Sequence, residues 1–365
     1  MKTILIAHNY TQNSFPVMSF HLANHLANKG NRVIFISHNP YFHERQVIKK
    51  ENAEIIVCSW PSQSRPTKIK DFVWFINIYL MYKPDTIIAH FVGSNITAIV
   101  SKILSFGKAS TLVYYHTLSS QILTDLKKLN FKQKFLFYRK KTFYRFFCDK
   151  LICPSELAKK DLKDYYSNTN GVVVLNPIID RFTGKMDISN SNIVISFLGR
   201  LDLSKGVLDL VTAFKIYIEK FPNSRLILNI AGSGSLQFEL TEMIRNTPTI
   251  CYLGGLIYEK IDEYLNKSHF VIIPSKFDAF NVVGIESMMN QTPLLISNTT
   301  GLTEYLTDGK ECFKFDSDIE SIVAVLKKAE DDFIHYKQMS VNARDTFLIK
   351  FSINDYCNKF SELIS

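Results

Sequence analysis

The sequence predicts an α/β protein with two doubly wound domains, each built on a parallel sheet that helices cover on both faces. Short β-branched runs alternate with helical patterns along the chain, which is typical of strands in a parallel sheet. The alternation begins again after a polar stretch near the middle. A chain of 365 residues is long for one domain and sufficient for two.

Seven strands are expected in the first half, each buried on both faces. They are TILIA (3–7), RVIFIS (32–37), EIIVC (54–58), TIIAHF (86–91), STLVYYH (110–116), KLICPS (150–155) and GVVVLN (171–176). Between the first two, residues 17–30 carry apolar side chains at helical spacing and end on Gly30, which favours a helix stop there. We place the first domain at residues 1–180.

A linker and a second domain are expected in the remainder. Residues 180–192 (DRFTGKMDISNSN) are polar and turn-prone, which is typical of a linker. The strands expected after it are NIVISFLGR (192–200), RLILNIAGSG (225–234), TICYLGG (249–255), HFVIIPS (269–275) and TPLLIS (292–297), with a helix near 206–221. We place this domain at residues 190–348 and expect ligands beyond the carboxyl ends of its strands.

Composition and charge narrow the function classes. Six scattered cysteines lack metal-ligand spacing, which favours reduced, buried thiols. The start, MKTILIAHNY, is too short for a signal-peptide core, and residues 72–82 are too few to span a bilayer, so we expect a soluble, cytoplasmic chain. Residues 1–180 hold 24 Lys and Arg against 11 Asp and Glu, while the remainder holds 19 against 23. The basic half predicts an anionic partner.

Four strand-to-helix loops in the second half are candidates for a ligand site. They contain Arg200 and Lys205 (FLGRLDLSKG), Gly232 and Ser233 (AGSGS), Gly255 and Leu256 (LGGL), and Asp278 (PSKFDAFNVVGIESMMN). The two cations of the first loop suit a diphosphate, and the glycine-rich turns let the backbone approach a ligand closely. A surface loop with ordinary charges is the alternative.

The fourth loop places two carboxylates around an expected helix start. Asp278 lies just before a helix that should begin near Asn281 or Val282, and Glu286 lies one turn into it. Free N–H groups at a helix start favour an anion, and carboxylates accept paired sugar hydroxyls. The residues expected to contact a ligand here are Glu286 and the segment Phe280, Asn281, Val282 and Val283. The alternative is an acid that caps the helix and another on its surface.

Together these motifs resemble the retaining glycosyltransferases of family 4. A carboxylate, seven residues and a Glu in a strand–loop–helix setting is similar to the family signature. The other similar motifs are FLGRLDLSKG, whose Arg200 and Lys205 match donor-diphosphate ligands; the glycine-rich turn at Gly232–Gly234; STLVYYHT, which ends near His116; the last donor-side loop NTTGLTEYLTDG (298–309); and the closing helix FSINDYCNKFSELI (351–364).

The resemblance implies the GT-B fold, in which two Rossmann-like domains face each other across a cleft and a C-terminal helix (350–365) completes the first. It implies transfer of a hexose-type sugar, with retained anomeric configuration, from a nucleotide-diphosphate donor to a glycan or lipid-linked glycan acceptor. A UDP-sugar is expected rather than a GDP-sugar, and the expected role is bacterial cell-surface polysaccharide synthesis. No cofactor and no metal are expected.

The resemblance also implies residue roles without a covalent nucleophile. Arg200, Lys205 and the helix start would stabilise charge on the leaving phosphate. Asp278 would orient the donor sugar and Glu286 the ribose. His116 would contact the sugar or stabilise positive charge at its anomeric carbon, unless it is simply a structural histidine at a strand end.

Several departures keep other functions open. Asp278 stands where the family usually has Glu, Ala279 and Asn281 replace glycines, HNYTQNSFP (8–16) replaces a Gly-Gly loop, and LNPIID (175–180) lacks a usual Gly. The alternatives are a non-catalytic sugar-nucleotide or glycan-binding protein of this fold, or a GT-B epimerase. Asp316-Ser317-Asp318 resembles a metal-binding D-x-D, although a helix N-cap is the plainer interpretation. No G-x-G-x-x-G follows the first strand, which disfavours a dinucleotide dehydrogenase.

The stretch 127–150 interleaves nine Lys or Arg with eight aromatic residues. On a helix this pattern is typical of proteins that bind a membrane surface. The hypothesis is peripheral contact with an anionic membrane, at its inner face, beside a lipid-linked glycan acceptor. The alternative is a solvated helix whose aromatic residues face the core. Nucleic acid is disfavoured as a partner, because the rest of the chain resembles a sugar-nucleotide enzyme.

Overall fold

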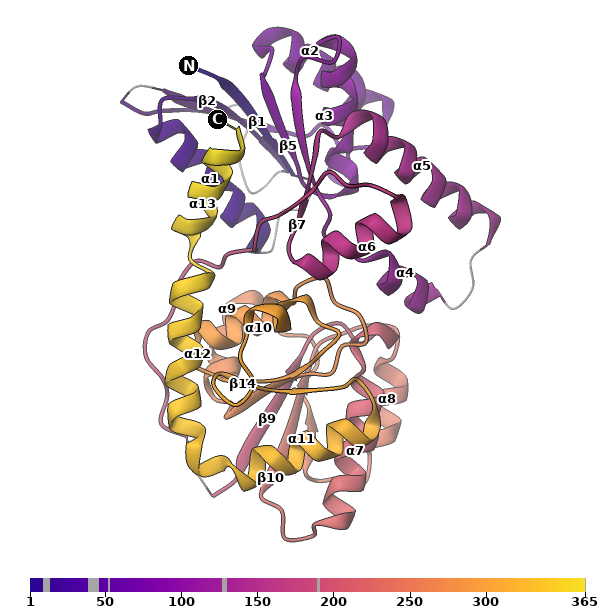
Figure 1. Ribbon diagram of the computed structural model, residues 1–365, viewed down its shortest axis with the longest axis vertical. Helices are drawn as coiled ribbons and strands as arrows, with labels where there is room; N and C mark the ends of the chain where they lie inside the picture. Colours follow the sequence, from indigo (N-terminus) through magenta and orange to yellow (C-terminus); the bar gives the residue numbers. More distant parts are fainter. Residues whose placement is uncertain (9–13, 39–45, 52, 127–129, 189–190, 365) are drawn as a thin grey trace.

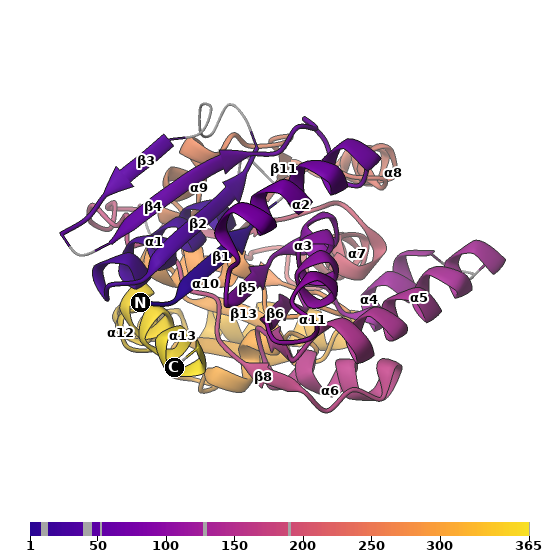
Figure 2. The same ribbon diagram turned by 90° about the horizontal axis from the view of Figure 1, so that it is seen from above.

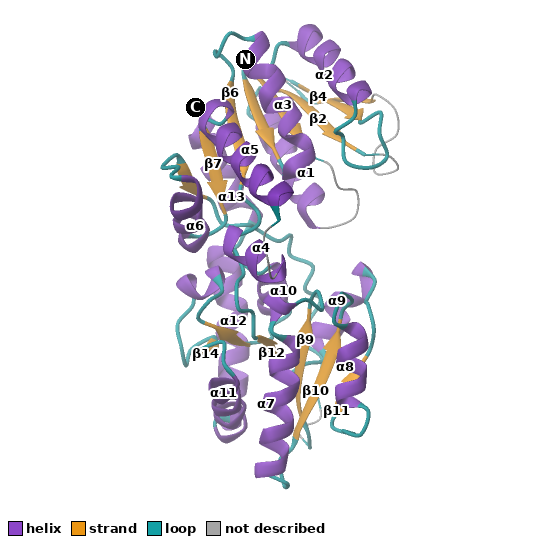
Figure 3. Cartoon of the chain, turned by 90° about the vertical axis from the view of Figure 1, so that its right-hand side faces the viewer, coloured by secondary structure: helices purple, strands orange, loops and turns teal. Residues whose placement is uncertain are grey.

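The computed structural model describes residues 1–8, 14–38, 46–51, 53–126, 130–188 and 191–364 (Figure 1). Two separate sheets confirm the predicted pair of doubly wound α/β units. Figure 3 shows the sheets one above the other, with α4 and α10 between them. Most of the unusual first loop, residues 9–13, lies outside the described residues.

The first sheet has the strand order β3-β4-β2-β1-β5-β6-β7-β8 (Figure 2). Its strands are β1 Thr3–Ala7, β2 Arg32–Ser37, β3 Gln46–Lys49, β4 Glu54–Ser59, β5 Thr86–Ala89, β6 Ser110–Tyr114, β7 Lys150–Cys153 and β8 Gly171–Val173. All seven strands expected in this half are present, and β3 joins them as an antiparallel partner of β4. β3 is mostly exposed, so it lacks the apolar run that identified the others.

Helices cover both faces of this sheet. They are α1 Ser14–Asn28, α2 Ile69–Tyr82, α3 Phe91–Leu104, α4 Ser119–Leu126, α5 Phe131–Phe147, α6 Glu156–Tyr166 and the C-terminal α13 Ile353–Ile364. On one face α1 and α13 bury Leu22, Leu26 and Phe360 against the strands. α2 and α3 pack on the other face, followed by α5 and α6. The last helix therefore packs with the first domain, although most of its sequence neighbours lie in the second.

The second sheet is parallel, in the order β11-β10-β9-β12-β13-β14. Its strands are β9 Ile193–Leu198, β10 Leu226–Ala231, β11 Ile250–Tyr252, β12 Phe270–Ile273, β13 Leu294–Ser297 and β14 Cys312–Phe315. The helices are α7 Val207–Lys220, α8 Gln237–Ile244, α9 Tyr258–Asn266, α10 Val282–Met289, α11 Ile319–Asp331 and α12 Tyr336–Lys350, with short 3₁₀ turns η1 Leu203–Lys205, η2 Gly301–Tyr305 and η3 Phe333–His335. The five strands and the helix expected here are present.

The chain crosses between the two sheets at two neighbouring points. The Ile178 amide donates to the Phe351 carbonyl over 3.3 Å, which joins the linker to the segment between α12 and α13. Near the cleft, the Ser155 hydroxyl donates to the Ala279 carbonyl over 2.6 Å. The first bond holds the two crossing segments together against the core of the second domain, and the second bond joins the two domains directly.

Two further expectations can be compared with the structure. Five of the six cysteines are buried and all six are free, but Cys251 is exposed, so the expectation of buried thiols was wrong at that position. Cys251 lies on the short edge strand β11, where neighbours cover less of the chain. Across the described residues, no helix combines the length and the hydropathy that a membrane span requires.

Candidate active site

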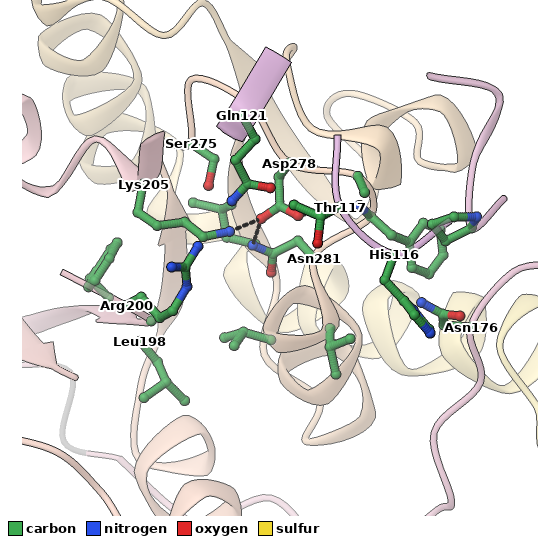
Figure 4. Close-up of a pocket in the computed structure, with 18 of the residues that line it drawn as sticks. His116, Thr117, Gln121, Asn176, Leu198, Arg200, Lys205, Ser275, Asp278 and Asn281 are labelled. Carbon is green, nitrogen blue, oxygen red and sulfur yellow. Dashed lines mark hydrogen bonds and ion pairs between the residues drawn. The ribbon is translucent and has the colours of Figure 1, made fainter. Parts of the chain in front are cut away.

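A cleft of about 770 Å³ opens between the two sheets and is lined from both domains (Figure 4). The first domain contributes His116, Thr117, Gln121, Ile122, Pro154 and Asn176. The second contributes residues 197–200, Lys205, residues 272–273, Ser275 and residues 278–283. The volume lies in the range of about 300–1,000 Å³ found for small-molecule sites. The structure therefore brings Asp278, His116, Arg200, Lys205 and the segment 280–283 together in one cleft.

Asp278 and Lys205 form an ion pair at the centre of this cleft. The Lys205 Nζ lies 2.5 Å from Asp278 Oδ2, and Asn281 Nδ2 donates to the same oxygen over 2.8 Å (Figure 4). The side chains are only 15% and 10% exposed. Burial alone would raise the pKa of Asp278, but the Lys205 charge and the hydrogen bonds from Asn281 and Phe280 outweigh it and lower this pKa below its ordinary value. Asp278 is consequently ionised at neutral pH.

The start of α10 faces the cleft, as expected from the sequence. Asn281, not Asp278, is the N-cap: its side chain accepts from the Gly284 amide over 2.8 Å. Its φ of 70° lies in the left-handed region, which Asn adopts more readily than most residues. Val282 and Val283 follow in the cleft wall. Because first-turn N–H groups have no acceptor within their helix, this end of α10 suits an anion.

Arg200 follows β9 and lies at the cleft wall with 59% of its side chain exposed. It pairs with Asp202 in the same loop. An ion pair at such exposure contributes little to stability. Arg200 can therefore turn toward an anionic ligand without disturbing the fold.

Glu286 lies outside the residues that line this cleft. Its side chain is buried, and its Oε1 lies 3.7 Å from Arg181 Nη2. Arg181 also makes a two-pronged pair with Asp262, over 2.8 and 3.0 Å, and its guanidinium covers the Tyr258 ring. Sequence reasoning missed Arg181, because a linker arginine has no local motif.

The glycine-rich turns pack beside the Arg200 loop and do not line the cleft. Gly232 has φ +143°, and a Cβ there would lie 1.8 Å from the Gly199 carbonyl oxygen, so only glycine fits. Its amide donates to the Gly254 carbonyl over 2.8 Å. Ser233 and Gly255 are exposed and Leu256 is partly exposed. The three loops after β9, β10 and β11 form one edge next to the cleft.

His116 is one of four histidines that directly or closely follow adjacent strands, and it shares a stack of rings with two of them. His8 follows β1, His90 follows β5 and His116 follows β6. The rings of His8 and His90 stack at 4.0 Å, and Tyr114 stacks on His90 at 3.8 Å and on His116 at 4.9 Å. Burial lowers the pKa of His116 to about 3 and holds the pKa values of His8 and His90 well below normal. All three rings are neutral at pH 7.

Gln121 reaches the second domain and was missed by sequence reasoning. Its Nε2 donates to the Ser204 hydroxyl over 3.4 Å, next to Lys205. Gln121 lies on α4, whose first turn is held by Asp161: the Ser119 amide and the Ser120 hydroxyl donate to that carboxylate over 2.8 and 2.9 Å. No local sequence signal could have identified Gln121 or Asp161, because each acts through a partner that is distant in the sequence.

Both aspartates of the D-x-D motif accept hydrogen bonds from protein groups, and one of them caps a helix. Asp318 accepts from the Ser321 amide over 2.8 Å at the start of α11, and Asp316 accepts from Asn298 over 2.7 Å. The N-cap interpretation is therefore confirmed for Asp318. Within the part of the chain that the structure describes, no group of three or more His, Cys, Asp or Glu could hold a metal ion.

Two family models match successive parts of the chain. Residues 17–181 match the model described as Glycosyltransferase Family 4, and residues 179–346 match Glycosyl transferases group 1. The chain belongs to the family 4 glycosyltransferases. The two matches meet at residues 179–181, in the linker between the sheets.

This chain is similar to a curated relative and to solved structures over different lengths. It is 26% identical to the capsular polysaccharide biosynthesis glycosyltransferase CapM of Staphylococcus aureus over 168 residues, 45% of this chain and 43% of that one. The first curated relatives are matched over 32% to 43% of their own length, so the chain spans less than half of them.

The similarity to solved structures covers the whole of this chain. Sucrose-phosphate synthase from Thermosynechococcus elongatus is 14% identical with a TM-score of 0.77, covering 100% of this chain and 98% of that one. Anabaena HepE in complex with UDP is 14% identical with a TM-score of 0.72, covering 100% and 99%. At this identity the match shows the fold alone, and it confirms the predicted GT-B architecture.

Proposed function

We propose that this chain is a retaining glycosyltransferase that moves a hexose-type sugar from a nucleotide-diphosphate donor to a glycan or lipid-linked glycan acceptor. The observation that carries the proposal is the cleft in which Arg200, Lys205 and the start of α10 converge around Asp278. Cations and helix N–H groups suit a diphosphate. The HepE complex with UDP supports a UDP-sugar donor, and the name of CapM supports a role in bacterial cell-surface polysaccharide synthesis.

The proposed reaction depends mainly on electrostatic stabilisation. The bond between the anomeric carbon and the diphosphate oxygen breaks, and the acceptor oxygen bonds to that carbon on the same face. The acceptor proton moves to the leaving diphosphate. Arg200, Lys205 and the Val282–Val283 end of α10 stabilise the charge that develops there.

The remaining residues orient the donor. Asp278 accepts from sugar hydroxyls while it stays paired with Lys205. His116, neutral at pH 7, hydrogen-bonds the sugar rather than acting as a cationic acid. Glu286 binds the ribose, which requires it to share or exchange its contact with Arg181. The turns that carry Gly232, Ser233, Gly255 and Leu256 surround the nucleoside beside the cleft.

A turnover assay separates this proposal from the two alternatives. The chain is incubated with UDP-hexoses and a glycan or lipid-glycan extract, and UDP and sugar products are measured with and without EDTA. A glycosyltransferase releases UDP and elongates the extract, in the presence of EDTA as well. If the chain binds the UDP-hexose but releases no UDP, it is a non-catalytic binder. If it converts the sugar nucleotide into another one without an acceptor, it is an epimerase. Either result would contradict transfer.

The proposal includes contact with the inner face of an anionic membrane through α5 and its flanks. Of the eight aromatic residues in this stretch, Phe143 and Tyr144 are buried, while Phe131, Phe135, Tyr138 and Phe146 are exposed. Exposed aromatic residues among nine cations suit an anionic lipid surface. Co-sedimentation with vesicles that contain anionic lipid tests this, and no binding of the wild type at low salt would contradict it.

A further inference from the structure

A second cavity, of about 580 Å³, lies on the first domain and was not anticipated from the sequence. Apolar side chains from three helices form its walls: Phe72 on α2, Ile96 and Ile99 on α3, and Leu136, Phe137 and Phe143 on α5. Its volume is again that of a small-molecule site. Among the described residues, only Ile122 lines both this cavity and the donor cleft. The proposed donor therefore does not account for the cavity, which has no assigned ligand.

The charges at this cavity have one sign. Arg65, Arg139 and Lys140 line it, and every charged residue among its described lining is a cation. The Lys140 Nζ lies 5.1 to 5.5 Å from the ring centroids of Tyr115, Tyr144 and Tyr166. Burial lowers the pKa of Lys140 to about 8, against an opposing effect of Asp161. An anion beside these three cations would stabilise their charge.

The cavity adjoins the donor cleft. Ile122 on α4 lines both of them, and its neighbour Gln121 lines the cleft. Figure 2 shows α4 and α5 extending together from the side of the first domain. A molecule held between α3 and α5 can therefore present its polar end toward the site of transfer.

We propose that this cavity binds the lipid chain of a lipid-phosphate-linked acceptor, with its phosphate near Arg65, Arg139 and Lys140 and its sugar hydroxyl directed past Ile122 into the cleft. This inference rests on the proposed function and names the acceptor class. Apolar walls with a cationic rim match an amphiphile with an anionic head group. A free oligosaccharide would leave the apolar walls unused, and an acidic peptide would lack the continuous chain that fills them.

Isothermal titration with farnesyl phosphate, below its micelle-forming concentration, tests the cavity. The wild type should show saturable binding, and farnesol and inorganic phosphate should each bind more weakly because each supplies only one part of the match. Leu136→Glu places a carboxylate against the lipid chain and should weaken binding roughly tenfold or more. Arg139→Gln should also weaken it, through loss of a phosphate contact.

Phe131→Glu is the matched control. Phe131 lies on the same helix and is 86% exposed, but it does not line the cavity. This variant should bind farnesyl phosphate like the wild type while it sediments less with anionic vesicles. Equal binding by wild type and Leu136→Glu, or no saturable binding by the wild type, would overturn the proposal. Equal losses in Leu136→Glu and Phe131→Glu would also overturn it, because they would point to general surface adsorption.

The melting temperatures without ligand and with UDP show whether a loss of binding comes from the cavity or from misfolding. Leu136 is 40% exposed, so its replacement should fold, and the melting temperature without ligand verifies this. If it does not fold, Phe72→Glu on the opposite wall replaces it in the test. UDP should raise the melting temperature of both Leu136→Glu and Phe131→Glu. A UDP shift without farnesyl phosphate binding contradicts the cavity alone, whereas the absence of a UDP shift contradicts the proposed function.

Discussion

Replacing Lys205 with alanine is expected to lower the rate of sugar transfer by roughly 10²–10³-fold, the effect of losing one preorganised charge-stabilising group. The loss has two causes. Lys205 would no longer stabilise the leaving diphosphate, and Asp278, which lies 2.5 Å from its Nζ, would be left buried without its counter-charge. Breaking a buried pair in this way costs about 3–5 kcal/mol of stability. Steady-state kinetics and urea unfolding measure the two effects.

Lys276→Ala is a suitable control for Lys205→Ala. Lys276 also forms an ion pair, with Asp209 over 2.6 Å, but it does not line the cleft. Its replacement should leave the transfer rate within a fewfold of wild type. Lys205→Arg keeps the charge and should retain more activity than Lys205→Ala. Wild-type kinetics in Lys205→Ala would contradict the role assigned to this residue.

Replacing Asp278 with asparagine is expected to cause the second largest change, on both activity and pH-dependent stability. The folded-state pKa of Asp278 is lowered, whereas an unfolded Asp has a pKa of about 3.9. The ionised pair therefore stabilises the fold above about pH 4, and this contribution disappears as the pH falls through the folded-state pKa. The variant should be less stable by about 3 kcal/mol at pH 7, with a smaller difference at lower pH, and transfer should fall by roughly a hundredfold.

Urea unfolding of both proteins between pH 7 and pH 3 tests this dependence. A difference in unfolding free energy that stays constant over the whole range would show that folding does not lower the pKa of Asp278, contrary to expectation. Asp316→Asn provides the control, since Asp316 is exposed and lies outside the cleft. Its transfer rate should match that of the wild type.

Much of the fold could be predicted because buried parallel strands need apolar residues on both faces. That requirement shows in runs such as RVIFIS and HFVIIPS whatever surrounds them. Two strands carried no such signal. β3 is mostly exposed at the sheet edge, and β14, Cys312–Phe315, is short and runs into the acidic segment that suggested a D-x-D motif.

The central part of the site could be predicted for a similar reason. Arg200, Lys205 and Asp278 follow strands of one parallel sheet, so topology alone brings them to the same edge. The direction of Glu286 could not be predicted, because it depends on how α10 packs against α9 and on Arg181 far away in the sequence. The interdomain contact of Gln121 with Ser204 depends on how two separate domains meet.

The most direct test of the central claim is the melting temperature with UDP, GDP and ADP, measured on wild type, Arg200→Ala and Arg245→Ala. Arg200 and Arg245 are similarly exposed, 59% and 67%, and each pairs with a nearby acid, but only Arg200 lines the cleft. A ligand that binds only the folded state raises its melting temperature. We expect UDP to raise it for wild type and Arg245→Ala, with or without EDTA, and to raise it much less for Arg200→Ala. No shift with any nucleotide, or an equal shift in all three proteins, would contradict a nucleotide-diphosphate site in this cleft.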